Sequence, residues 1–323
     1  MISNYPRGFL GDNFGVVSRG MPFMQFHSGE VFWVGNGPTV VDGEITASNS
    51  NRGSFFQPFA TLDYAIGRCV ANRGDIIYVK PGYTQSMTAA DAVDVDVAGV
   101  TIIGLGRGNV VPKFTYDNSA GEFVIGAANV HIENLWFVPS VTGITKAIDI
   151  ESGSHFSGVY GCRFGDAEAA GTDEFNATII VASASTDVKI IGNYINMGEA
   201  GAVAGITITG ACHRIRIQNN EIWGDYSTAN INSITALQSD VIITDNLLVN
   251  GVTSGLNTEP TIELLTGTSG VIARNNSAAN VATLAAHQVN DTAANFQNNF
   301  TEDRGSGNTS AQTATSVVAS ADD

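Results

Sequence analysis

Three pairs of a glycine and an acidic residue recur in the middle of the chain at similar intervals. They are Gly165-Asp166, Gly198-Glu199 and Gly224-Asp225. Stacked carboxylates can bind calcium, a hard cation that takes oxygen ligands, or can act as the acid and base of a glycoside hydrolase. The same pattern also fits a glycine turn followed by a solvated residue. Asp166, Glu199 and Asp225 are therefore the catalytic candidates if the chain is an enzyme, and they are weak calcium candidates.

Two basic residues form a second candidate. Lys189 and Arg216 hold the same place in successive copies of the repeat described below, so they are expected to be neighbours. The pair suits a lyase base or an acidic ligand, and it equally suits a solvated or partner-facing surface. The five histidines and three cysteines show no spacing typical of a metal site. No cofactor is therefore expected.

Short apolar strands that recur along the chain predict the frame that carries these residues. One series comprises Val100–Ile102, Val130–Ile132, Ser157–Val159, Val188–Ile190, Ile215–Ile217, Val241–Ile243 and Val271–Ala273. Their starts lie roughly 26–31 residues apart, which is within the range of solenoid repeats. A second series with the same step comprises Phe123, Ile148, Ile179, Ile206, Ile234 and Ile262. Two series with one period predict that each coil contributes strands to at least two stacked parallel sheets.

Asparagines follow the first strand in several copies of the repeat. The predicted structural ladder comprises Asn193, Asn220, Asn246 and Asn276, with Asn134 and a degenerate Asn299 as further members. An inward asparagine at a tight turn can bond the backbone of the coils above and below it, so these residues are interpreted as structural. Cys162 occupies the same position in its coil and is interpreted as a small core residue.

A helix is predicted near residues 59–70, ahead of the repeat. Its apolar residues recur at helical spacing, and Thr61 can cap its start. The glycine and aspartate at 74–75 end this segment, and Ile76–Val79 follows as a β-branched strand. A short helix laid across the open end of a solenoid covers its apolar core, as terminal caps do in repeat proteins.

The stretch Ser50–Tyr83 contains a set of residues in a characteristic order. They are Asn51, Gly53, Pro58–Leu62, Ala65-Ile66, Gly74–Ile77 and Lys80–Gly82. This order resembles the entrance to a right-handed parallel β-helix of the pectate-lyase-like superfamily. The expected fold is therefore all-β: a single-stranded right-handed parallel β-helix with a short N-terminal capping helix. The expected organisation is a docking arm over 1–49, the β-helix over 50–305 and a polar tail over 306–323.

The composition limits the partners. The 323 residues include 15 basic and 31 acidic ones, which gives a formal charge of −16. Such a surface argues against general binding of nucleic acid or of an anionic membrane. No apolar run is long enough for a transmembrane helix, and no secretory signal is recognisable at the start. The candidate docking residues of the arm are Phe9, Phe14, Phe23, Phe32 and Trp33.

The stretch from Ser50 onward, continued through Asp94–Gly108, also resembles β-helix proteins encoded among bacteriophage head genes. This resemblance implies a virion structural protein, namely a capsid decoration or cement protein on the particle exterior. It further implies a homotrimer that binds the major capsid protein of the same particle. The alternatives are a tailspike-like polysaccharide depolymerase or lyase and a non-catalytic protein that binds a host surface glycan. Whether the chain is an enzyme stays open, with the non-enzymatic interpretation favoured.

Overall fold

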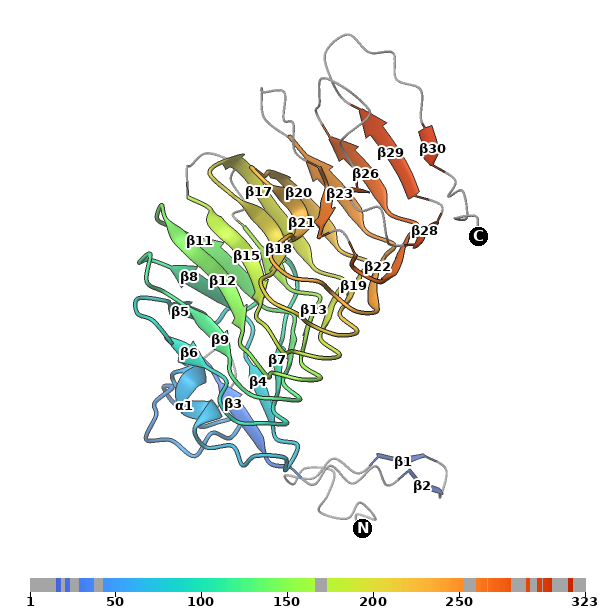
Figure 1. Ribbon diagram of the computed structural model, residues 1–323. Helices are drawn as coiled ribbons and strands as arrows, with labels where there is room; N and C mark the ends of the chain where they lie inside the picture. Colours follow the sequence, from blue (N-terminus) through green and yellow to red (C-terminus); the bar gives the residue numbers. More distant parts are fainter. Residues whose placement is uncertain are drawn as a thin grey trace.

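The computed structural model describes residues 29–37, 43–165, 173–251, 260–265 and 267–279, together with the backbone of short strands at 16–18, 21–23, 289–290, 295–297, 299–303 and 313–315. The side chains at 199, 200 and 279 are outside this description. The chain forms a parallel β-solenoid in which three long sheets run side by side (Figure 1). The predicted all-β solenoid is therefore confirmed. A separate antiparallel pair, β1 (Val16–Ser18) and β2 (Met21–Phe23), precedes it.

Sheet 1 contains the strands that the first apolar series predicted. Its members are β3 (Val31–Val34), β4 (Ile76–Val79), β7 (Thr101–Gly104), β10 (His131–Glu133), β13 (Gly158–Tyr160), β16 (Lys189–Ile191), β19 (Arg216–Gln218), β22 (Val241–Thr244), β25 (Gly270–Ala273) and β28 (Asn295–Gln297). β3 comes from the arm expected over 1–49 and pairs in parallel with β4, so the solenoid includes a strand from that arm.

Sheet 2 follows sheet 1 within each coil. Its members are β5 (Thr84–Ser86), β8 (Lys113–Tyr116), β11 (Trp136–Pro139), β14 (Arg163–Phe164), β17 (Tyr194–Ala200), β20 (Glu221–Asp225), β23 (Leu247–Asn250), β26 (Asn276–Ala279), β29 (Asn299–Asp303) and β30 (Thr313–Thr315). All described pairings in it are parallel except β29 with β30. A 3-10 turn, Gly108–Val110, lies just before β8.

Sheet 3 completes each coil. Its members are β6 (Val93–Asp94), β9 (Phe123–Ile125), β12 (Ile144–Ile150), β15 (Phe175–Val181), β18 (Ala204–Ile208), β21 (Ala229–Ser233), β24 (Ile262–Leu264) and β27 (Val289–Asn290). Ile231, rather than the predicted Ile234, aligns with Ile206 and Ile262 in this sheet. Coil 1 is here β4, β5 and β6, coil 2 is β7, β8 and β9, and later coils are numbered in the same way.

Left-handed backbone turns the chain between sheets. The residues with positive φ between sheets 1 and 2 include Asn134, Gly161, Gly192, Asn219, Asp245 and Arg274, and those between sheets 3 and 1 include Gly99, Asn129, Phe156, Asp187, Arg214 and Asp240. Asparagine, aspartate and glycine adopt this conformation at low cost, which explains their recurrence at these corners. Salt bridges of 2.6 Å join Arg214 to Asp187 and Arg274 to Asp245 in the preceding coils.

The asparagine ladder lies one residue beyond the corner between sheets 1 and 2. The Oδ1 atoms of Asn220, Asn246 and Asn275 each accept a hydrogen bond from the backbone amide of the ladder residue in the preceding coil. The structure places Asn193, Asn220 and Asn246 in this column. The next member is Asn275, whereas the predicted Asn276 is exposed on β26.

The register of coil 8 explains this one-residue correction. Strand pairing aligns Val241 with Gly270, so the ladder position five residues further on falls at 275. In the earlier coils the ladder position is occupied by buried Leu135 and Cys162. Asn134 is the corner residue instead, and its side chain donates to the carbonyls of Gly104 and Gly106.

The capping helix is shorter than predicted. α1 covers Leu62–Ile66, and the Thr61 side chain accepts from the Tyr64 amide as its N-cap. Leu62, Ala65 and Ile66 are buried against the first coils, so the helix covers the core at this end (Figure 1). The helix ends at Gly67, whereas the prediction extended it to residue 70.

Two buried charged groups fix the segment before the repeat to coil 1. Asp75 is fully buried and accepts from the amides of Glu30 and Val70 and from the guanidinium of Arg73. Lys80 is 3% exposed, and its Nζ lies 2.5 Å from Glu44 Oε1. These bonds join β3 and the loop around residue 44 to the strand β4 and the turn that follows it. Among the described residues, no helix is long and apolar enough to cross a membrane.

Candidate functional site

Two of the acidic residues that follow a glycine, Glu199 and Asp225, do not share one register. Strand pairing aligns Gly224 with Met197 and Asp225 with Ala200, because β17 carries extra residues at this point. Gly198 and Glu199 fall within that bulge and have no partners of the same type in β20. Asp166 and the Glu199 side chain lie outside the described residues, so only Asp225 of this candidate set can be placed, half-buried on β20.

Lys189 and Arg216 are neighbours on the outer face of sheet 1, as strand pairing aligns them directly. The same column contains His131 and Gly158 in the preceding coils. Burial lowers the pKa of His131, and the positive charge of Lys189 lowers it further. The influence of Lys189 extends across one intervening coil, where Gly158 provides no side chain. This column is therefore a weakly basic surface strip.

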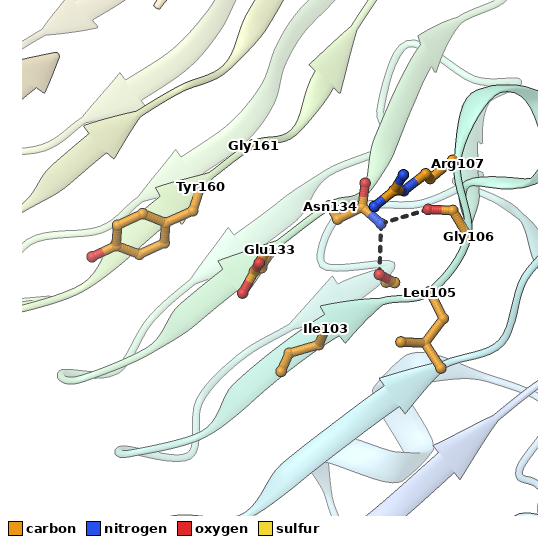
Figure 2. Close-up of a pocket in the computed structure, with 9 residues that line it drawn as sticks. Ile103, Leu105, Gly106, Arg107, Glu133, Asn134, Tyr160 and Gly161 are labelled. Carbon is orange, nitrogen blue, oxygen red and sulfur yellow. Dashed lines mark hydrogen bonds between the residues drawn. The ribbon is translucent and has the colours of Figure 1, made fainter. Parts of the chain in front are cut away.

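A shallow groove of about 470 Å³ lies at the edge of sheet 1 near its first coils. Figure 2 shows the outward side chains of Ile103, Glu133 and Tyr160 on three neighbouring strands, with Leu105 and Arg107 beyond them. The wall is fixed by Asn134, whose amide nitrogen lies 2.7 Å from the Gly104 carbonyl oxygen.

The chemistry of this groove is that of a binding surface. The Tyr160 ring packs directly over Gly158. A Cβ atom built on that glycine would lie only 2.5 Å from the ring, so a larger residue there would displace it. His131 contacts the same ring with centroids 5.5 Å apart. An aromatic ring beside Glu133, with Arg107 at the other end of the groove, can contact a small polar ligand through stacking and hydrogen bonds. The groove has one carboxylate among its lining residues, so it does not provide the pair that glycoside hydrolysis uses.

A pair of carboxylates does meet on the outer face of sheet 3. A Cβ built on Gly126 would lie 3.3 Å from Glu151 Oε2 and 3.4 Å from Asp94 Oδ1. The two oxygens therefore face the same gap over the glycine, at a separation no greater than these two distances together. Glycoside hydrolases place their two carboxyl groups about 5–9.5 Å apart, and the limit set by Gly126 allows only the lower part of that range.

The two carboxylates have different environments. Burial raises the pKa of Asp94, and the negative charges of Asp96, Asp91, Glu151 and Asp63 raise it further. Glu151 is exposed. A carboxyl group whose pKa is raised, placed beside an exposed carboxyl group, is the kind of asymmetry that acid–base catalysis uses. Asp94 is thus the candidate acid and Glu151 the candidate base or nucleophile.

Sequence reasoning missed this pair because its members belong to coils 1 and 3. They are separated by 57 positions in the printed sequence, and only the alignment of Asp94 with Val124 and of Val124 with Asp149 brings their strands together. A detectable signal was present in the acidic alternation of Asp94 and Asp96, which is repeated by Asp149 and Glu151.

The predicted docking residues fall into three groups. Phe9 and Phe14 lie outside the described residues, and of Phe23 only the backbone is described. Phe32 is 7% exposed and packs against Phe59, so the docking role predicted for it is wrong: its side chain belongs to the core. Trp33 lies on the outer face of β3 between the rings of Tyr78 and Phe55, with centroids 5.0 and 4.9 Å away.

Metal and thiol chemistry have little basis in the described part of the chain. Within it, no group of three or more His, Cys, Asp or Glu side chains is placed to hold a metal ion. The three cysteines are free, and burial raises the pKa of both Cys69 and Cys162 to about 12. Thiols in this state are poor nucleophiles at neutral pH.

The chain is similar in fold to several solved structures. No protein-family model matches the chain, and no curated protein matches it. Among solved structures, a rhamnogalacturonan lyase is 15% identical with a TM-score of 0.47, over 86% of this chain and 83% of that one. Pectate lyase Pel9A is 12% identical with a TM-score of 0.41, over 83% of this chain and 79% of that one. The GH136 lacto-N-biosidase from Eubacterium ramulus is 11% identical with a TM-score of 0.41, over 82% of this chain and 67% of that one.

Proposed function

We propose that the chain is a structural protein of a bacteriophage virion, a decoration or cement protein on the capsid exterior that acts as a homotrimer. The docking end is the N-terminal end of the solenoid, and its partner is the major capsid protein of the same particle. The observation that carries this proposal is the construction of that end, where a segment preceding the repeat is held in place by buried charges and carries exposed apolar side chains.

The exposed side chains are Ile45 and Phe56, which are 46% and 49% exposed. The ring of Phe56 stacks edge-on against Phe55, whose own ring lies under the Lys80 ammonium. The Lys80 ammonium also donates to the Phe55 carbonyl oxygen. Phe56 is thus an apolar group on a fixed support, which suits an interface anchor because little conformational freedom is lost on binding.

Replacing Phe56 by aspartate is expected to weaken binding of the protein to capsids by at least about tenfold, since an anchor ring is lost and a charge is introduced at the contact. Cosedimentation with particles assembled from the major capsid protein of the same genome measures this effect. The matched control is Phe156→Asp, which changes a phenylalanine that is 52% exposed at a corner of coil 4. If both variants bind capsids as well as the unchanged protein does, the surface around Phe56 is not the docking surface.

Cryo-electron microscopy of the particle tests the role itself. Density for the solenoid is expected on the capsid exterior, at local three-fold axes, with the N-terminal end toward the shell. Density at the tail tip would overturn the decoration role and favour the depolymerase alternative.

The second candidate function is hydrolysis of a host surface polysaccharide, and the Asp94–Glu151 pair is the observation that favours it. If the protein is such an enzyme, Asp94→Asn and Glu151→Gln should each lower oligosaccharide release about a hundredfold or more, because general acid–base groups contribute factors of this size. Asp240→Asn, at an exposed corner between sheets 3 and 1, is the control and should retain activity. Absence of released oligosaccharide from the unchanged protein, with host polysaccharide as substrate, would eliminate this candidate.

A further inference from the structure

A column of alternating cationic and aromatic side chains runs along the outer face of sheet 2. Strand pairing aligns Lys113, Trp136, Arg163 and Tyr194 in coils 2 to 5, and these four residues are here called the basic column. Lys113 Nζ and the Arg163 guanidinium each lie 4.2 Å from the Trp136 ring, on neighbouring strands to either side. The indole is 3% exposed and donates to the Gly165 carbonyl, so it holds both cations in place.

The cations of this column have no carboxylate partner within the described residues. The salt bridges there use Arg73, Lys80, Lys146, Arg214 and Arg274, and none involves Lys113 or Arg163. In a chain of formal charge −16, two fixed cations without a counter-ion on one face are conspicuous. Their surroundings favour a partner that supplies negative charge at a defined spacing.

The complementary surface is on sheet 3 of the same chain. Asp94 and Asp96 in coil 1, and Asp149 and Glu151 in coil 3, form what is here called the acidic patch. Lys146 beside it is already paired with Asp149 and Glu122. Asp94, Asp96 and Glu151 have no ion-pair partner among the described residues. Burial is the main cause that raises the pKa of Asp94, and the negative charges of the neighbouring carboxylates raise it further.

The spacing of the two surfaces matches. Lys113 and Arg163 are two coils apart, with uncharged Trp136 between them. The acidic positions are also two coils apart, and the intervening coil 2 presents Val124 and Gly126. The backbone positions of each pair are therefore about 9.6 Å apart at a strand spacing of about 4.8 Å. In both pairs the charged ends lie over the uncharged residue between them, Trp136 in one case and Gly126 in the other.

The heights along the solenoid match as well. After sheet 3 of one coil, the chain passes through sheet 1 and then sheet 2 of the next coil. Lys113 of coil 2 therefore lies about two thirds of a coil, or about 3 Å, beyond the level of Asp94 in coil 1. Arg163 of coil 4 has the same offset from Glu151 in coil 3. Lysine and arginine side chains are long enough to cover this difference.

We propose that the basic column on sheet 2 of one copy binds the acidic patch on sheet 3 of a second copy, with the two solenoids side by side and pointing in the same direction. The interface joins different faces of identical chains, so it repeats from copy to copy, and a rotation of one third of a turn about an axis parallel to the solenoids closes it into the ring of three. This assignment rests on the homotrimer of the proposed function and names the surfaces that form it. Figure 1 shows the strands concerned, β8 and β11 of sheet 2 and β6, β9 and β12 of sheet 3, in the half of the solenoid next to α1.

The two uses of the acidic patch exclude one another. In the ring, the gap over Gly126 faces the neighbouring copy, whereas a hydrolase needs that gap open to substrate. A protein whose trimer depends on Asp94 and Glu151 is therefore not a hydrolase at this pair.

Charge reversal with rescue is the decisive test, read by sedimentation velocity and native mass spectrometry of the full chain. The Lys113→Glu/Arg163→Glu variant and the Asp94→Lys/Glu151→Lys variant are each expected to weaken association about a hundredfold or more, because like charges then face each other. The variant carrying all four changes is expected to regain it. Lys189→Glu/Arg216→Glu makes the same charge change on sheet 1 and is expected to remain trimeric.

Two controls keep the outcome readable. Circular dichroism identifies any variant that fails to fold after loss of the contacts to Trp136. Zero-length carbodiimide crosslinking of the unchanged protein supplies an independent readout, as it should join the Lys113 amine of one copy to Asp94 or Glu151 of another. A trimer that persists in both reversal variants would overturn the interface while leaving the homotrimer intact. An unchanged protein that sediments as a monomer would overturn both the interface and the homotrimer, and particle imaging would then decide the virion role separately.

Discussion

Replacement of Asn220 by alanine should lower the free energy of unfolding by about 3–5 kcal/mol, since several buried hydrogen bonds lose a partner at once. The Asn220 side chain accepts from both nitrogens of Asn193, at 2.9 and 3.0 Å, and donates to the Ile190 carbonyl and to Asn246 Oδ1. Alanine would leave the Asn193 amide and the Ile190 carbonyl buried without partners. Urea unfolding measures the loss, and hydrogen exchange should show faster opening in coils 5 and 6.

The pair Asn275→Ala and Asn276→Ala provides the matched control for this prediction. Asn275 is 1% exposed and bonds both Asn246 and the Ile243 carbonyl of the preceding coil, whereas Asn276 is exposed. Only the first variant should be destabilised. Equal effects at the two positions would contradict the register of coil 8 and the energetic role of the ladder.

Replacement of Asp75 by alanine should have an effect of similar size, about 3–5 kcal/mol, because a fully buried carboxylate is lost and two backbone amides and the Arg73 guanidinium lose their acceptor. Those amides belong to Glu30 and Val70, each with a bond of 2.7 Å to the carboxylate. The loss should be concentrated at the N-terminal end, where Asp75 joins β3 to α1 and β4. Urea unfolding combined with limited proteolysis of the segment around residue 30 measures it.

The effect of Asp75 should also depend on pH. Burial opposes ionisation of this carboxyl, but the hydrogen bonds from Arg73 and from the two amides outweigh it, so its pKa is lowered from the model-peptide value of 3.8. A lowered folded-state pKa contributes stability that is present above pH 3.8 and is lost as the pH falls through the folded-state value. The stability difference between the unchanged protein and Asp75→Asn should therefore shrink on acidification below pH 3.8. A difference that stays constant from pH 7 to pH 2 would contradict this assignment.

The fold was predictable from sequence because strands with one period must stack as a solenoid. The apolar columns of sheet 1 fall where the series of valines and isoleucines predicted them. Local register was less predictable, since a one-residue shift preserves most of the apolar pattern. The start of β25 at Gly270 rather than Val271 moved the ladder residue from Asn276 to Asn275. Glycine has no side chain to mark its place in a hydrophobic column, so the sequence offered no signal there.

The candidate site was less predictable for a related reason. A bulge in β17 separates Glu199 from the register of Asp225, and bulges carry no sequence mark of their own. The Asp94–Glu151 pair depends on coils that are two apart and on a glycine between them. Side chains that are distant in sequence meet only when the length of every intervening turn is known. The short capping helix likewise depends on the turn at Gly67, whereas the apolar spacing predicted a longer segment.

The ladder has a consequence for the length of the rod. The two ladder residues Asn220 and Asn246 each present the same donors and acceptors to the coil before and the coil after. A coil in this region can therefore be duplicated or deleted without leaving an unmatched group in the ladder, and the far end would shift by about 4.8 Å each time. Evolution of this protein can thus adjust its reach in single coils at this place, while the capped end with Asp75 and Lys80, whose contacts are unique, stays unchanged.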